Sequence, residues 1–162
     1  MIAAIEKAIE MMRMIYEQAG EERNPPVLFD PKDGDPEFMI PVLAALGLDA
    51  VFSGAQISDA AFDVISGCLS KRGVTVRRND GGICCSGRLI PGYFNVPADV
   101  SSAFVCGMLF SLPTLKGFSV LSVFGKARDE ELTGACEKYL LESGIKFDKK
   151  GGTYIIPPDQ SF

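Results

Sequence analysis

Gly73-Val-Thr-Val-Arg-Arg-Asn-Asp-Gly-Gly-Ile83 recurs, with one residue deleted, as Gly144-Ile-Lys-Phe-Asp-Lys-Lys-Gly-Gly-Thr153. In each copy a short strand leads through a Gly-Gly turn into a return strand, which is the pattern of a β-hairpin. Gly54 and Gly125 are separated by the same 71 positions as Gly73 and Gly144. Matching turns and glycines at a single period indicate that a structural unit has been duplicated.

The order of predicted elements around these glycines is the same in both halves: helix, strand, helix, hairpin. Asp59, Asp99 and Asp129 precede apolar helical segments, and each is predicted to cap its helix. In the first half we expect a short strand at 27–29, helices over 36–46 and 59–71, and strands at 50–53, 74–78 and 83–86. In the second half we expect helices over 101–112 and 129–143 and strands at 117–124, 145–148 and 153–156. The chain is therefore predicted to be an α/β (α+β) protein, a conclusion about its fold that does not name a function.

An amphipathic helix is predicted at the N-terminus, over residues 2–18 and closed by Gly20. Its apolar stripe contains Ile2, Ile5, Ile9 and Met12. Such a helix either packs on the sheets of its own domain or mediates dimerisation, and the first is the commoner arrangement. It is also a candidate remnant of a further repeat.

Composition excludes several classes of function. The chain has 162 residues, no histidine and a net charge of −5, without a strong basic cluster. We therefore expect no His-based catalysis, no metal site and no nucleic-acid partner. No apolar run is long enough to span a membrane, and no signal peptide is evident, so we expect a cytoplasmic protein without a membrane partner.

The five cysteines are predicted to be structural. They are Cys68, Cys84, Cys85, Cys106 and Cys136, an odd number with no C-x-x-C pair. An odd count in a cytoplasmic chain argues against a disulfide framework, and no neighbouring group is placed to activate a thiolate.

A serine pair marks the start of the helix predicted after Asp99. Ser101 and Ser102 place two hydroxyls in its first turn, beside free backbone N–H groups and the positive end of the helix dipole. This arrangement suits a phosphate or a carboxylate. The same pattern is also that of a serine-rich helix cap without any ligand, and the residues alone leave both interpretations open.

The segment from Gly92 to Pro113, which contains this turn, resembles the enolpyruvylshikimate-phosphate synthase (EPSP synthase) family. In that family a strand and a Ser-Ser-Gln-Phe turn open a helix that ends in Leu-Pro. The resemblance implies repeated βαβαββ units, as in one domain of the family's inside-out α/β barrel. It divides the chain into the helix at 1–20 and units at 27–90 and 91–157, together one compact domain. It also implies that Ser101 and Ser102 bind the phosphate of shikimate 3-phosphate, with no metal or organic cofactor.

The chain departs from the family pattern at several positions. Ala103 replaces the glutamine that contacts both substrates, and Gly34-Asp35-Pro36-Glu37 stands in place of Asn-Ala-Gly-Thr. The loop at 55–61 lacks the family's arginines, while Asp129 and Leu132 replace a serine and a tyrosine. Lys126 and Arg128 either restore part of the positive charge or are ordinary solvated cations. The family's second domain, which supplies a catalytic Asp and Lys, has no counterpart in this sequence.

Three hypotheses follow. In the first, the chain is a fragment or half of an EPSP synthase, inactive alone, that needs a second domain or companion chain to transfer the enolpyruvyl group of phosphoenolpyruvate. In the second, it is a non-catalytic binding or interaction module derived from that fold. The third is an unrelated duplicated α/β domain.

Overall fold

The first half of the chain forms a four-stranded sheet with two helices. The computed structural model describes residues 10, 26–30, 32 and 34–162, so the helix predicted over 2–18, with Gly20, lies outside the described residues apart from residue 10. The elements are β1 (Val27–Phe29), α2 (Pro36–Leu46), β2 (Ala50–Ser53), α3 (Asp59–Ser70), β3 (Val74–Asn79) and β4 (Gly82–Gly87). The strand order is β1-β2-β4-β3; β1 pairs parallel with β2, and the other pairs are antiparallel. We call this sheet A.

The second half repeats the same arrangement in sheet B. Its elements are β5 (Tyr93–Pro97), α4 (Ser102–Ser111), the short 3₁₀ helix η2 (Leu112–Thr114), β6 (Ser119–Phe124), α5 (Glu130–Glu142), β7 (Asp148–Lys150) and β8 (Thr153–Ile156). The strand order, β5-β6-β8-β7, matches that of sheet A position by position, with β5 parallel to β6. The predicted α/β fold with repeated βαβαββ units is therefore confirmed.

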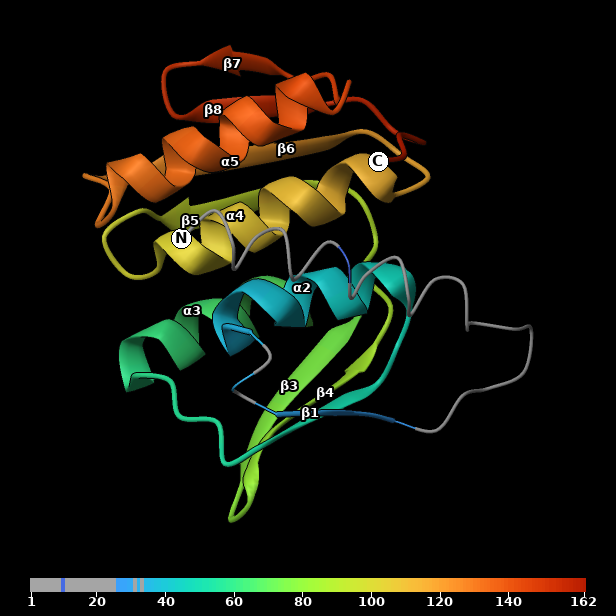
Figure 1. Ribbon diagram of the computed structural model, residues 1–162, viewed down its shortest axis with the longest axis vertical. Helices are drawn as coiled ribbons and strands as arrows, with labels where there is room; N and C mark the ends of the chain where they lie inside the picture. The colour runs from blue at the N-terminus through green and yellow to red at the C-terminus, as the bar shows by residue number, and fades with distance from the viewer. Residues whose placement is uncertain (1–9, 11–25, 31, 33) are drawn as a thin grey trace.

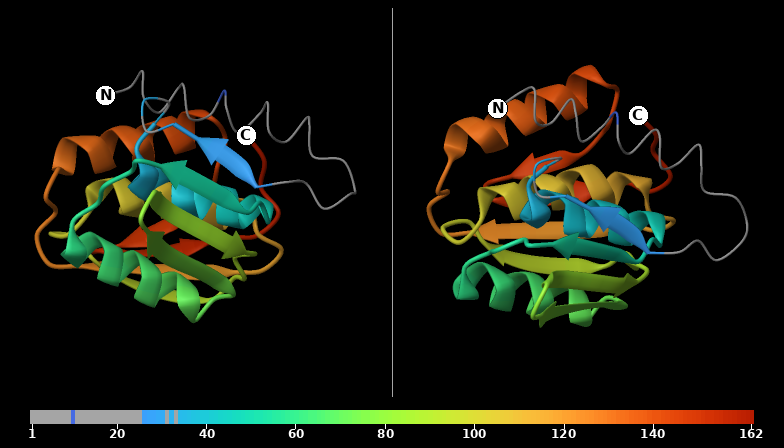
Figure 2. Two further views of the ribbon diagram at one scale, coloured as in Figure 1. Left: turned by 90° about the horizontal axis from the view of Figure 1, so that it is seen from below. Right: turned by 60° about the horizontal axis from the view of Figure 1, so that its bottom comes forward.

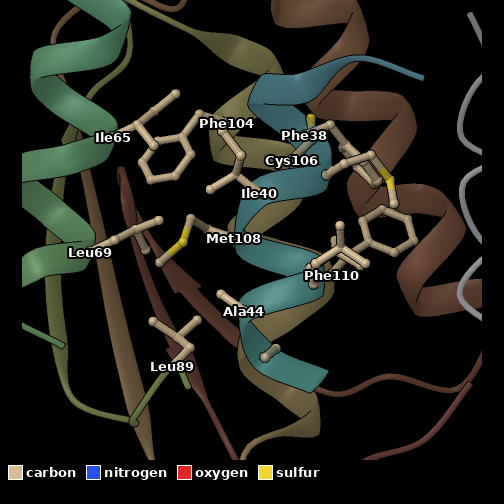
Figure 3. Close-up of a cluster of buried hydrophobic side chains, with 14 of the residues drawn as sticks. Phe38, Ile40, Ala44, Ile65, Leu69, Leu89, Phe104, Cys106, Met108 and Phe110 are labelled. Atoms are coloured by element: carbon tan, nitrogen blue, oxygen red, sulfur yellow. The ribbon is translucent and has the colours of Figure 1, made fainter. Parts of the chain in front are cut away.

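Two helices, α2 and α4, lie side by side in the middle of the molecule (Figure 1). Every residue from Phe104 to Ser111 is buried, as expected for a helix that is apolar on all sides. The outer helix α3 instead buries one face, through Ala61, Ile65 and Leu69 at a spacing of four. Side chains from α2, α3 and α4 meet in one hydrophobic core, where Met108 of α4 lies between Ile40 and Leu69 (Figure 3).

The N-terminal ends of α2, α3, α4 and α5 all lie at the same end of the molecule (Figures 1 and 2). This follows from the topology, because each helix leaves the same end of its sheet after a strand. The partial positive charges of the four helix ends are thereby gathered together, which makes this end the place to look for a site.

Two predicted helix caps were wrong by one or two residues. Ser58, not Asp59, caps α3, and Ser101, not Asp99, caps α4. In both cases the capping residue is the one with extended backbone whose side-chain oxygen accepts from an N–H three residues later. Asp129 caps α5 as predicted, with its Oδ1 accepting from Leu132 N at 2.9 Å.

No helix in the part of the chain that the structure describes combines the length and the apolar character needed to cross a membrane.

Candidate functional site

A hollow of about 430 Å³ opens where the four helix N-termini meet. Each of α2, α3, α4 and α5 contributes to its wall through its cap or its first turn. The polar residues of the wall are Glu37, Ser58, Ser101, Ser102, Arg128 and Asp129. The two predicted site residues, Ser101 and Ser102, thus lie together in a concave site, and we call it the four-helix hollow.

Ser101 is engaged in two contacts. Its Oγ accepts a hydrogen bond from Phe104 N at 3.0 Å, which caps α4. The same hydroxyl donates its proton to the carboxylate of Glu37, in the first turn of α2. Because a hydroxyl has one proton, Ser101 has none left to donate to a ligand while Glu37 holds this position.

Ser102 is engaged in one contact. Its buried Oγ accepts from Asp129 N at 2.9 Å and so ties the loop before α5 to the start of α4. No acceptor for the hydroxyl proton of Ser102 is found among the described residues. Ser102 is therefore able to donate one hydrogen bond into the four-helix hollow.

Glu37 is an acid at a position where an anion would need a donor, as the sequence indicates, but its contact with Ser101 was not predicted. Partial burial raises the pKa of the Glu37 carboxyl, and the neighbouring Asp35 acts in the same direction. The hydrogen bond from Ser101 and the charge of Arg128 lower this pKa in part, and the net direction is upward. Holding an ionised Glu37 against α4 therefore has a solvation cost.

This raised pKa predicts a pH-dependent stability. Between the ordinary value of 4.5 and the raised value, folded Glu37 binds more protons than unfolded Glu37, so its stabilising contribution is present at lower pH and lost as the pH rises. The Glu37→Gln variant lacks this loss. We expect the difference in free energy of unfolding to move in favour of E37Q as the pH rises through this window, measured by urea unfolding of both proteins. A difference that is independent of pH would contradict the raised pKa.

The cations near the four helix ends have different surroundings. Arg128 lines the four-helix hollow close enough to Glu37 for its charge to lower the pKa of that carboxyl in part, whereas Lys126 lines a separate hollow beside β6 and β8. The loop after β2, predicted to lack arginines, is reached by Arg78 from β3. Its guanidinium donates to Ile57 O at 2.7 Å and forms an ion pair with Asp59. This cation is already neutralised.

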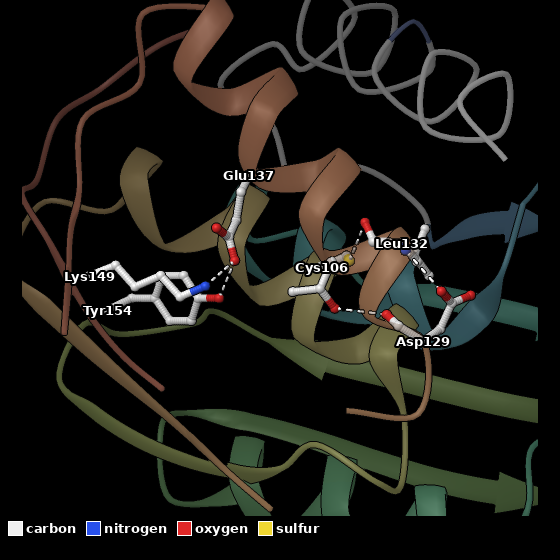
Figure 4. A network of polar contacts seen from close by, with 7 residues as sticks. Cys106, Asp129, Leu132, Glu137, Lys149 and Tyr154 are labelled. Carbon is white, nitrogen blue, oxygen red and sulfur yellow. Dashed lines mark hydrogen bonds and ion pairs between the residues drawn. The ribbon is translucent and has the colours of Figure 1, made fainter. Parts of the chain in front are cut away.

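The second hairpin repeats this arrangement with different partners. Lys149, at the position that corresponds to Arg78, donates to Glu137 of α5 at 2.7 Å. Tyr154 donates to the same carboxylate oxygen at 2.6 Å, and burial raises the pKa of this tyrosine above its usual range (Figure 4). In both units an ion pair from a basic residue of the hairpin joins the hairpin to the preceding helix. The 71-residue period that joins Arg78 and Lys149 was the available signal for these contacts.

The five cysteines are free thiols. Burial raises the pKa of Cys68 to about 11 and that of Cys85 to about 12. Cys106 lies between α4 and α5 with its thiol 3.8 Å from Leu132 O (Figure 4). Among residues 26–30, 32 and 34–162, with residue 10, no three Cys, Asp or Glu side chains gather in a way that would hold a metal ion.

Comparison with known proteins relates the sequence to a family. No family model matches the chain. Over 131 residues it is 32% identical to the 3-phosphoshikimate 1-carboxyvinyltransferase of Clostridium kluyveri, a match covering 77% of this chain and 30% of that protein. The enzyme of the same name from Brachyspira hyodysenteriae is 31% identical over 110 residues, which are 67% of this chain and 26% of that protein.

The fold is shared with a solved structure. An EPSP synthase from Acinetobacter baumannii superposes on 83% of this chain with a TM-score of 0.61 and 16% identity, over 31% of its own length. The chain thus spans less than a third of the proteins that it matches. It is a partial homologue of the 3-phosphoshikimate 1-carboxyvinyltransferases, the EPSP synthase family, and contains two βαβαββ units of the family's fold.

Proposed function

We propose that the chain is one part of an EPSP-synthase-like enzyme, which holds the phosphate of shikimate 3-phosphate through Ser101 and Ser102 and does not transfer the enolpyruvyl group alone. The observation that carries the proposal is the position of both serines at the start of α4, inside the four-helix hollow and beside Arg128. Four helix N-termini and one arginine favour an anionic group there. The free proton of Ser102 supplies one donor to it.

The lining of the four-helix hollow supports the second half of the proposal. The four-helix hollow contains no lysine among the described residues, and its two acids, Glu37 and Asp129, are each engaged in hydrogen bonds within the chain. Addition and elimination of an enolpyruvyl group require a positioned acid and base in a site closed to water. We propose that residues 27–90 and 91–157 form one domain, and that a companion domain or chain in the cytoplasm supplies these groups.

The proposal predicts saturable stabilisation by substrate. At 100 times its dissociation constant, shikimate 3-phosphate should add about 2.7 kcal/mol of stability, roughly 5 to 10 °C in Tm for a chain of this size. Thermal unfolding of the whole chain at rising shikimate 3-phosphate, with and without phosphoenolpyruvate, measures this shift. Unphosphorylated shikimate is the control ligand.

The serines give the matched control. The double variant Ser101→Ala with Ser102→Ala should lose the shift while still folding, which its own unfolding transition reports. Turnover of the two substrates by the purified chain alone would contradict the claim that it is inactive without a partner.

A non-catalytic binding or interaction module is the second candidate. Two contacts within the chain favour it, because they occupy groups that a ligand would need: Glu37 accepts the proton of Ser101, and Asp59 pairs with the charge of Arg78. This function predicts no change in Tm at millimolar shikimate 3-phosphate, so the same titration separates the two candidates.

A further inference from the structure

The helix α4 differs from the other three helices of the hollow in the charge of its first turn. Acidic residues occupy the first turns of α2, α3 and α5, where they complement the helix dipole. The first turn of α4 contains none. Its N-terminus therefore depends on a group from elsewhere for its negative charge.

That group is Glu37. The residue belongs to α2, yet its carboxylate accepts the hydrogen bond of Ser101 Oγ at the cap of α4. The contact joins positions 64 apart in the sequence. This contact is possible because α2 packs closely against α4, which brings the first turns of both helices to the same hollow.

We propose that Glu37 determines the ligand specificity of the four-helix hollow. Its carboxylate is an internal anion at the position where a phosphate would bind, so the ionised site rejects a doubly charged ligand and the neutral site accepts one. This inference rests on the proposed function, because it concerns the same serines. It assigns the protonated or neutralised form of residue 37 as the form that takes a phosphate monoester.

The charges around Glu37 support this assignment. Asp35 faces it from the residue before α2, and Asp129 lies in the same wall at the cap of α5. Arg128, from the loop before α5, is the cation that opposes them, and α3 presents the neutral Ser58. With two acids and one arginine in its wall, the hollow holds no excess positive charge for a dianion while Glu37 is ionised. Glutamine at this position removes one like charge, and its neutral amide oxygen is a weaker acceptor than a phosphate oxygen for the proton of Ser101.

The experiment measures binding of sulfate and of shikimate 3-phosphate to the whole chain and to E37Q by isothermal titration calorimetry. Sulfate is included because it stays doubly charged throughout the pH range used. We expect E37Q to bind both anions about tenfold more tightly at neutral pH. We expect the unmodified chain to approach E37Q as the pH is lowered from neutral and Glu37 takes up its proton, whereas the affinity of E37Q for sulfate changes little.

Glu131→Gln is the matched control. Glu131 is an exposed acid in the first turn of α5 that does not line the four-helix hollow, so this variant makes the same change of net charge at a helix N-terminus. Its affinity should equal that of the unmodified chain. If E131Q gained as much affinity as E37Q, the effect would come from net charge alone, and the inference would be overturned.

The remaining outcomes separate the inference from the proposed function. Equal binding by the unmodified chain and E37Q, lost when Ser101 and Ser102 are replaced by alanine, overturns the inference and leaves the function standing. Tighter binding by E37Q at neutral pH, approached by the unmodified chain at lower pH and lost with the serines, supports both. No saturable binding by either protein at any pH overturns the function and the inference together.

Discussion

Replacing Gly107 by alanine is expected to destabilise the fold by about 3 kcal/mol, although alanine is the better helix former. Gly107 lies in the middle of α4, where this helix crosses α2. A Cβ at this position would lie 2.4 Å from the carbonyl oxygen of Phe38 and 2.8 Å from Cγ of Pro41. The first of these neighbours is backbone of a buried helix, so the strain is relieved only if α2 and α4 move apart. Urea unfolding followed by far-UV circular dichroism measures the loss.

Two other helical glycines provide controls of opposite sign. At Gly67 in α3 and Gly134 in α5, no heavy atom of another element in the described part of the chain lies within 4 Å of the point that a Cβ would occupy, so alanine fits there without strain. Gly67→Ala and Gly134→Ala should each stabilise the chain by about 0.5 to 1 kcal/mol. If Gly107→Ala also stabilised the chain, the conclusion that α2 and α4 pack too closely for a Cβ at this position would be contradicted.

The fold could be predicted because both units contain turns with a backbone conformation that few residues other than glycine adopt. Gly54 and Gly125 both have a positive φ, of 70° and 84°, directly after the second strand of their units. Gly73 and Gly144 have φ of 84° and 85° after the second helix. Side chains disfavour this conformation, so glycine marks these turns in both copies and the period is visible in the sequence.

Strand β7 shows where local pattern was insufficient. The apolar residues of 145–148 predicted a strand there, whereas the structure places β7 at Asp148–Lys150. Ile145 is instead buried beneath the end of α5, with its N–H donating to Leu140 O. This hydrogen bond belongs to the C-terminal end of α5, so β7 begins only at Asp148. A hydrophobic residue that seals a helix end has the same local signature as the first residue of a strand.

The site was predicted in part for a similar reason. The position of Ser101 and Ser102 at a helix start followed from local sequence. Their partners, Glu37 and Asp129, come from elements that only the packing of α2 and α5 around α4 brings near. The sequence showed that Glu37 departs from the family pattern, with an acid at a position where an anionic substrate would need a donor. That it binds Ser101 depends on a tertiary contact that the sequence pattern does not contain.

Replacing Phe110 by alanine is expected to cost about 4 kcal/mol, because a large side chain is removed from a fully buried position. The ring of Phe110 lies at the centre of an aromatic cluster. Its centroid is 5.4 Å from Phe38 of α2, 5.9 Å from Tyr139 of α5 and 5.4 Å from Phe162 near the C-terminus. The variant therefore loses contacts to two helices and to the end of the chain. Chemical unfolding of the variant and the unmodified chain measures the difference.

Phe118→Ala is the matched control, because the same side chain is removed from a loop position that is 66% exposed. Its effect should stay within about 0.5 kcal/mol. A double-mutant cycle then isolates the stacked pair: Phe110→Ala and Phe162→Ala should be coupled by about 1 kcal/mol, since the two rings are nearly parallel, with an interplanar angle of 13°. Additive effects would show that the C-terminal residue does not pack on α4 in solution, and the aromatic cluster would then join α2, α4 and α5 alone.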